Sequence, residues 1–308
     1  MTEVSQRQTV PEPASKPVSV TIVVITRNRC QELMTTLAHL LSLPERPPVV
    51  VVDNGSEDGT AAAVRARFPY VRVVELGENF GAGARNFGVE VATTEYVAFA
   101  DDDSFWAPGS LSAAARILAA NPRVGLINAR ILVGPEGRED PVCTEMARSP
   151  LARDPNVPGI PVLGFVACGA IVRRRAYLAC GGFERRMRIG GEEDLLAVDM
   201  ASQGWDLRYV PEIVAHHHPS SVRDLRARRR DEVRNALWFA WLRRPPATAL
   251  ARTAKVLRAA PKDAITLAAL VQAALGLPWV IRRRRVAAPH AEREMRLLDS
   301  LRGRAPAG

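Results

Sequence analysis

Short apolar segments alternate with helix-like segments through the first two-thirds of the chain, and this alternation restricts the fold more than any other feature. Continuous runs of β-branched and other apolar residues are typical of strands that a parallel sheet buries on both faces. Such runs occupy residues 18–26, 49–52, 71–76 and 96–100, and helix-like segments occupy 31–43, 60–67 and 82–92. The order predicts an α/β fold built on a Rossmann-like, mostly parallel sheet.

Polar and acidic residues follow three of the expected strands. Thr26 ends the first strand and is followed by Arg27, Asn28 and Arg29, Asp53 ends the second, and Asp101-Asp102-Asp103 follows the fourth. Ligands of such sheets bind beyond the carboxyl ends of the strands. We therefore expect these side chains to form one site.

The three adjacent aspartates suggest a metal site. Their mutual repulsion needs compensation, and Mg2+ or Mn2+ can supply it while bridging to a diphosphate, because these ions take oxygen ligands. Alternation along an extended segment would place Asp101 and Asp103 on one side and Asp102 on the other. The competing interpretation is a solvated acidic turn.

A glycine-rich segment, residues 79–88, precedes the fourth strand. Backbone amides around Gly81 can approach a phosphate at the start of a helix, and Arg85 adds a positive charge. The segment is also similar to a dinucleotide-binding fingerprint, with Asn86 in place of its third glycine and Asp101 as the distant acid. A nicotinamide-dependent oxidoreductase is thus one alternative function. Glycines that only allow a helix to pack closely are the structural alternative.

A second acidic run, Glu192-Glu193-Asp194, opens a helix after two glycines. Carboxylates at a helix N-terminus are stabilised by the helix dipole, but a general base that deprotonates an acceptor hydroxyl also needs such a group. Both interpretations stay open.

The run His216-His217-His218 can supply a metal ligand or a phosphate contact, or consist of exposed loop residues.

In combination, these motifs resemble the inverting family 2 glycosyltransferases over residues 19 to about 220. The motifs are VVITRNR at 23–29, VVDNGS at 51–56, NFGAGARN at 79–86 and DDD at 101–103. The resemblance implies the glycosyltransferase A fold and a nucleotide-sugar donor. It also implies nucleotide binding by Thr26 and Asp53, Asp101 near the ribose and Asp103 on the metal. Some related bacterial members transfer rhamnose.

Downstream motifs of this family align to residues 181–212. An ungapped alignment from Gly181-Gly182-Phe183 places Glu193, rather than Asp194, at the position of the catalytic aspartate. Leu195 and Asp199 depart from the family's pattern. The metal-proximal histidine of the family falls at His216 or His217.

The composition changes beyond His218. Residues 223–308 carry 20 basic and 7 acidic residues, whereas residues 1–222 carry 22 and 26. We expect a disordered leader over 1–17, a nucleotide-sugar-binding catalytic domain over 18–222 and a basic helical extension over 223–308. A basic nucleic-acid-binding protein is an alternative based on charge alone. The first two-thirds of the chain is acidic and lacks interleaved exposed aromatic residues. This composition disfavours a nucleic-acid partner.

An apolar segment, residues 264–281, ends in four arginines at 282–285. Its length is at the lower limit for crossing a bilayer, so a reclining or re-entrant helix and a helix packed on the catalytic domain are alternatives. The arginines suit anionic headgroups.

Four scattered cysteines without metal-like spacing favour reduced thiols. We expect a cytoplasmic protein at the inner face of the cell membrane that uses a saccharide or lipid-linked saccharide acceptor in cell-surface glycan assembly.

Overall fold

The computed structural model describes residues 20–219 and 225–302. The predicted leader, residues 1–17, and the predicted domain boundary at 222/223 lie outside these ranges. The four cysteines lie within them and are unpaired.

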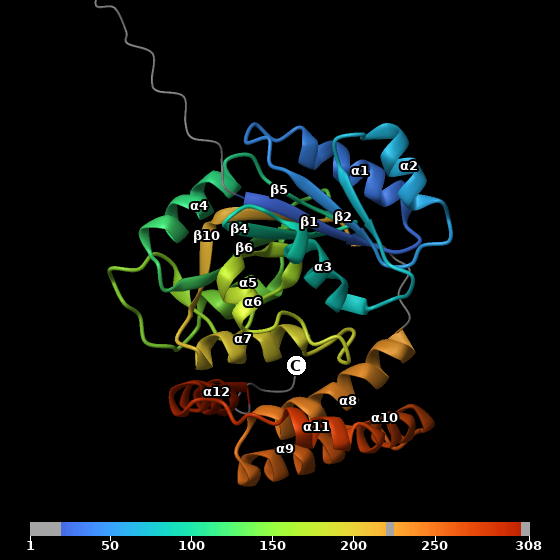
Figure 1. Cartoon of the computed structure of the whole chain (residues 1–308). Coiled ribbons are helices and arrows are strands. Elements are labelled where there is room, and N and C mark those ends of the chain that lie inside the picture. The colour runs from blue at the N-terminus through green and yellow to red at the C-terminus, as the bar shows by residue number, and fades with distance from the viewer. Residues whose placement is uncertain (1–19, 220–224, 303–308) are drawn as a thin grey trace, which may run out of the picture.

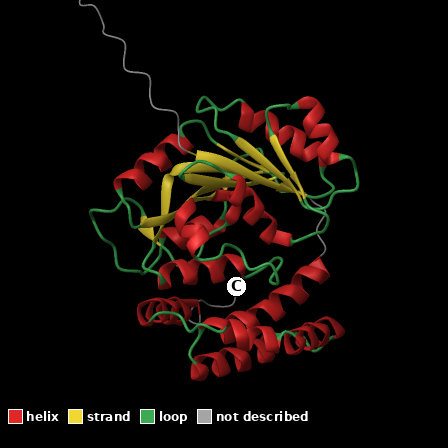
Figure 2. Ribbon diagram, viewed as in Figure 1, coloured by secondary structure: helices red, strands yellow, loops and turns green. Residues whose placement is uncertain are grey.

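One twisted sheet forms the centre of the molecule (Figure 2). Its strand order is β3-β2-β1-β4-β9-β6-β10-β5, and β7 and β8 pair at its margins with β6 and β10. The first four strands in this order are mutually parallel, as is the β6–β10 pair, while β9 and β5 run antiparallel to their neighbours. The predicted mostly parallel α/β sheet is therefore confirmed. The strands are β1 (Val20–Thr26), β2 (Val49–Asp53), β3 (Arg72–Glu75), β4 (Tyr96–Asp101), β5 (Ser104–Trp106), β6 (Val124–Val133), β7 (Arg138–Glu139), β8 (Ile160–Pro161), β9 (Ala170–Arg173) and β10 (Asp206–His217).

Helices cover both faces of the sheet (Figure 1). Alternate residues of β1 explain this, because Ile22 and Val24 pack into one buried apolar cluster while Val23 packs into another on the opposite face. The first face carries α1 (Cys30–Leu41), α2 (Thr60–Arg67) and α4 (Ser110–Ala120), and the second carries α3 (Ala84–Val91), α5 (Pro141–Ala147), α6 (Arg174–Ala179) and α7 (Glu192–Ser202).

Two local features complete the catalytic body between β6 and α7. Residues 134–159 contain β7 and α5, whose first turn is capped by Asp140 and begins with a proline. A 3-10 turn, η2 (Ala167–Gly169), leads directly into β9.

The C-terminal helices form a separate layer beneath α7 (Figure 1). Trp238 and Trp279 pack in this layer with Met187 and Leu195 of the catalytic body. The Asn235 side-chain amide donates hydrogen bonds to the carbonyls of Met187, Ile189 and Gly190, at 2.6–3.1 Å. The layer therefore fixes the loop that leads into α7. Its helices are α8 (Leu225–Arg243), α9 (Pro246–Ala259), α10 (Ala264–Leu275), α11 (Leu277–Arg283) and α12 (Pro289–Arg302).

The apolar segment 264–281 is divided between α10 and α11, which meet at a bend of 51°. Gly276 lies at the bend, and a Cβ atom there would approach the Trp238 ring to 2.5 Å. Within the described ranges, no single helix is both long and apolar enough to cross a bilayer, although this bent pair together meets the same length and composition test.

Candidate active site

The acidic run forms a tight turn between β4 and β5. β4 ends at Asp101, and Asp102 and Asp103 lie in the turn. Arg29 Nη1 donates to Asp102 Oδ1 at 2.8 Å and to Asp103 Oδ2 at 3.0 Å. The expected separation of Asp102 from Asp103 is therefore wrong, because strand alternation stops where the strand ends. Thr26, which we expected to bind the nucleotide, is buried and donates its hydroxyl to Asp102 Oδ2 at 3.0 Å.

Pairing of β10 with β5 brings a histidine to this turn. His217 aligns with Ser104 in the antiparallel pair, and its Nε2 lies 3.4 Å from Asp103 Oδ1. Burial would raise the pKa of Asp103, but His217 and Arg29 outweigh it and lower that pKa. His216 lies on the other side of the strand and stacks on Phe105, with ring centroids 5.0 Å apart. Of the two candidate ligands, His217 is the one beside the aspartates.

Asp103 and His217 suit a divalent ion by their chemistry, one supplying carboxylate oxygen and the other imidazole nitrogen. The part of the chain that the structure describes contains no group of three or more His, Cys, Asp or Glu side chains arranged to hold a metal. Asp101, the other expected ligand, is bound by Arg85 instead. Among the described residues this turn thus offers two donors, and an ion here would need further oxygen ligands of the kind that a diphosphate carries.

The loops after β1 and β2 lie side by side and bind each other. Asp53 is buried, and its carboxylate accepts a hydrogen bond from the Ser56 amide at 2.8 Å. Asn28 has a left-handed backbone, with φ of 53°, and its side-chain oxygen accepts from the Glu57 amide at 2.8 Å. Arg27 is exposed beside them. This arrangement places Thr26, Arg27, Asn28 and Asp53 at one sheet edge, as the sequence predicts.

The glycine-rich loop is held mainly by the protein itself. The Gly81 amide donates to Asn79 Oδ1 at 2.8 Å, and the Ala82 amide donates to the Arg188 carbonyl at 2.7 Å. Gly81 has φ of 59°, and a Cβ atom there would lie 2.6 Å from the Arg188 carbonyl oxygen. Because these two amides are already engaged, the structure favours the close-packing interpretation of Gly81 over the phosphate contact.

Asn86 has a structural environment too. Its amide nitrogen donates to the Phe183 carbonyl at 2.9 Å, while its oxygen accepts from the Tyr177 hydroxyl and the Phe183 amide. The side chain is buried. We therefore assign Asn86 to the turn at Phe183 and leave it out of the proposed donor contacts.

Arg85 is a buried cation among carboxylates. Its side chain is 5% exposed, pairs with Asp101, and lies over the rings of Phe99 and Phe183. Burial alone would lower its pKa, but the charges of Asp101, Glu193 and Glu192 raise it. Arg85 thus connects the acidic turn after β4 with the acidic start of α7.

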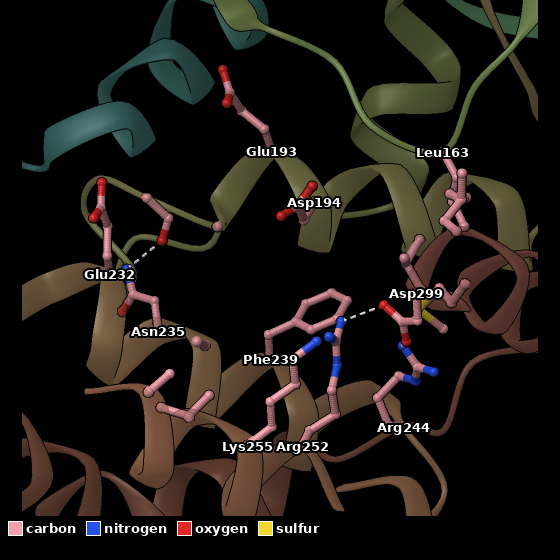
Figure 3. Close-up of a pocket in the computed structure, with 18 of the residues that line it drawn as sticks. Leu163, Glu193, Asp194, Glu232, Asn235, Phe239, Arg244, Arg252, Lys255 and Asp299 are labelled. Carbon is pink, nitrogen blue, oxygen red and sulfur yellow. Dashed lines mark hydrogen bonds and ion pairs between the residues drawn. The ribbon is translucent and has the colours of Figure 1, made fainter. Parts of the chain in front are cut away.

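Glu193 and Asp194 occupy different environments at the start of α7. Glu193 Oε1 accepts a hydrogen bond from the Ala167 amide of η2 at 2.6 Å. Burial, and then the charge of Glu192, raise the pKa of Glu193 to about 8. Asp194 is exposed and lies toward the C-terminal helices, whereas the carboxylate of Glu193 points away from them (Figure 3). Of these two acids, only Glu193 is therefore held within the carboxylate cluster around Arg85.

Sequence reasoning gave no role to two parts of this site. Arg29, three residues beyond β1, bridges two aspartates, and its closeness to the strand end was the available signal. Ala167 contributes only a backbone amide, which no sequence pattern marks.

Comparison with known proteins identifies the family of this chain. A model of the family "Glycosyl transferase family 2" matches residues 21–180. The chain belongs to this family. It is a glycosyltransferase, and the alternative of a nicotinamide-dependent oxidoreductase is set aside.

Two curated relatives come from Mycobacterium tuberculosis. An N-acetylglucosaminyl-diphospho-decaprenol L-rhamnosyltransferase is 28% identical over 64% of this chain and 75% of its own length. A pre-mycofactocin glycosyltransferase is 33% identical over 71% of this chain, which spans about half of that relative, 47%. Among solved structures, a mannosyltransferase from Pyrobaculum calidifontis in complex with GDP-Man and Mn2+ has a TM-score of 0.54 at 21% identity. The match covers 98% of this chain and 92% of that one. This similarity supports the fold.

Proposed function

We propose that this chain is an inverting, metal-dependent glycosyltransferase that moves a sugar from a nucleotide diphosphate to the hydroxyl of a lipid-linked saccharide. The observation that carries the proposal is the Arg85 cluster, in which one buried cation contacts Asp101 of the donor edge and lies among the acids of α7. A donor at the strand ends and an acceptor at α7 would meet there.

Glu193 is the base in this proposal. It takes the proton of the acceptor hydroxyl as the acceptor oxygen bonds to the anomeric carbon, and the bond from that carbon to the diphosphate breaks on the opposite face. The nucleoside diphosphate leaves with the electron pair. The Ala167 amide fixes the orientation of the Glu193 carboxylate, and Arg85 stabilises its ionised form. A divalent ion held by Asp103 and His217 would offset the negative charge of the leaving diphosphate.

We expect a nucleoside diphosphate to stabilise the protein only when Mn2+ or Mg2+ is present. Asp103 and His217 are too few to hold an ion alone, and Asp103 repels a diphosphate without one. The shift corresponds to about 2.7 kcal/mol at a ligand concentration 100 times the dissociation constant, and a thermal-shift assay measures it. His217→Ala should remove the metal-dependent part, whereas the matched variant His216→Ala should keep it. Equal stabilisation in EDTA would contradict a metal role.

The proposed acceptor class rests on two supports. One Mycobacterium tuberculosis relative acts, by its name, on a diphospho-decaprenol substrate and transfers rhamnose. The second support is an apolar face on α10 and α11, where Leu267, Leu275 and Ile281 are 63%, 76% and 73% exposed. The exposed Arg282 and Arg283 adjoin it. Such a face fits peripheral binding to an anionic membrane surface at the cytoplasmic side.

We expect the protein to co-sediment with vesicles that contain phosphatidylglycerol and much less with pure phosphatidylcholine vesicles. The double variant Leu275→Glu/Ile281→Glu should stay unbound, because it places two carboxylates in the contact. Tyr70→Glu, at a 98% exposed site on the catalytic body, is the matched control and should bind normally. Undiminished binding of the double variant would place the contact elsewhere on the protein.

A further inference from the structure

A cavity of about 570 Å³ lies between α7 and the C-terminal helices (Figure 3). Glu193 and Asp194 belong to its upper wall with Leu163, Gly190, Gly191 and Val198, and residues of α8, α9 and α12 form most of the rest. Most of its lining is therefore outside residues 21–180, the part that the family model matches.

The cavity has chemically distinct sides. Asp194 of α7 stands above it, and the α9 side carries Arg252 and Lys255, whose nitrogens point toward α7 in Figure 3. Phe239, Val256 and Leu298 supply apolar surface beside these cations. A ligand that fits this arrangement has an anionic group, an apolar part and a polar group that reaches the start of α7.

The positive charge on the α9 side is only partly neutralised. Arg252 pairs with Asp299 at 2.8 Å, and Asp299 also pairs with the buried Arg244. Arg228 pairs with Glu232 at 2.9 Å on the α8 side. Within residues 20–219 and 225–302, Lys255 has no carboxylate within ion-pair distance. One exposed lysine therefore lines the cavity with its charge uncompensated.

We propose that Lys255 and Arg252 bind the phosphate groups of a lipid-linked acceptor in this cavity, with its saccharide directed toward the start of α7. This assignment rests on the proposed function. The apolar face of α10 and α11 supports it, because Val256 of α9 and Leu270 of α10 pack against the same apolar cluster. A lipid that inserts at α10 and α11 would thus enter the helical layer that carries Lys255.

Binding of farnesyl diphosphate in EDTA, measured by isothermal titration calorimetry, tests the assignment without requiring transfer activity. We expect Lys255→Gln to weaken binding about tenfold, because a charge-assisted hydrogen bond is lost. Lys255→Arg should restore most of it. Lys262→Gln, at an exposed lysine just beyond α9, is the matched control and should bind as the unmodified protein does. Farnesol and inorganic pyrophosphate should each bind more weakly than farnesyl diphosphate.

The outcomes separate this site from the donor site. Asp103→Ala should leave farnesyl diphosphate binding unchanged, and a loss in that variant would place the diphosphate at the donor edge and overturn the assignment. Unchanged binding in Lys255→Gln, or an equal loss in Lys262→Gln, would overturn it too. Lys255-dependent binding in a protein that transfers no sugar would support the site while refuting the proposed function.

Discussion

Glu193→Gln is expected to lower sugar transfer about 10²–10⁴-fold, the range typical for loss of a general acid or base. The amide keeps the size of the side chain and retains an oxygen that can accept from the Ala167 amide. Donor binding should therefore persist, which a thermal shift with nucleoside diphosphate and Mn2+ would report. An assay of nucleoside diphosphate release measures the sugar transfer.

The two flanking acids serve as matched controls. Asp194→Asn changes an exposed carboxylate on the side of the C-terminal helices, and Glu192→Gln changes a buried one beside Glu193. Neither should reproduce the loss. If Asp194→Asn were inactive and Glu193→Gln active, the alignment of this motif would be wrong by one residue, and full activity in all three would remove the motif from catalysis.

The raised pKa of Glu193 gives the same residue two pH signatures. A base must be ionised, so kcat/KM should rise with pH until about 8 and then level off. Between pH about 4.5 and about 8 the folded protein holds a proton at Glu193 that the unfolded chain has lost, so this group lowers the free energy of unfolding as pH rises. Glu193→Gln should therefore gain stability relative to the unmodified protein across that window. A stability loss would instead favour a helix-terminus role.

Arg85→Met is expected to be the most destabilising single change near the site, at about 3 kcal/mol, the lower end of the range for a broken buried ion pair, because it leaves Asp101, whose side chain is 33% exposed, and the acids of α7 without their cation. Asp101 loses its ion pair, and the charges of Glu192 and Glu193 lose compensation. Urea denaturation measures the change. Arg65→Met, which removes an exposed ion pair with Glu75, is the matched control and should cost at most about 1 kcal/mol.

A second substitution tests the electrostatic origin of that loss. At a pH above 8, where Glu193 is ionised in the unmodified protein, Glu193→Gln should stabilise the Arg85→Met variant more than it stabilises the unmodified protein, because Arg85 no longer offsets that carboxylate charge. A loss no greater than that of Arg65→Met, or an equal gain in both backgrounds, would mean that Arg85 does not neutralise this cluster.

The amino-acid sequence by itself determined the fold class and the edge of the sheet where the site lies. Buried strands must be continuously apolar, so β1, β2 and β4 are visible as valine-, isoleucine- and alanine-rich runs, and their polar ends mark one edge. The motifs at these strand ends were sufficient to indicate the family, because their identity and order are local properties of the chain.

Only the tertiary structure decided which of the candidate side chains meet. His217 rather than His216 reaches Asp103 because β10 pairs with β5 in one register, and side chains of a strand alternate between its faces. Asn86 turns to Phe183, 97 residues away along the chain, and Lys255 comes to line a cavity below α7 through the packing of α8 and α9. These contacts join segments far apart in the sequence. Local sequence patterns carry no information on which distant segments pack together. These contacts therefore depend on the folded structure alone.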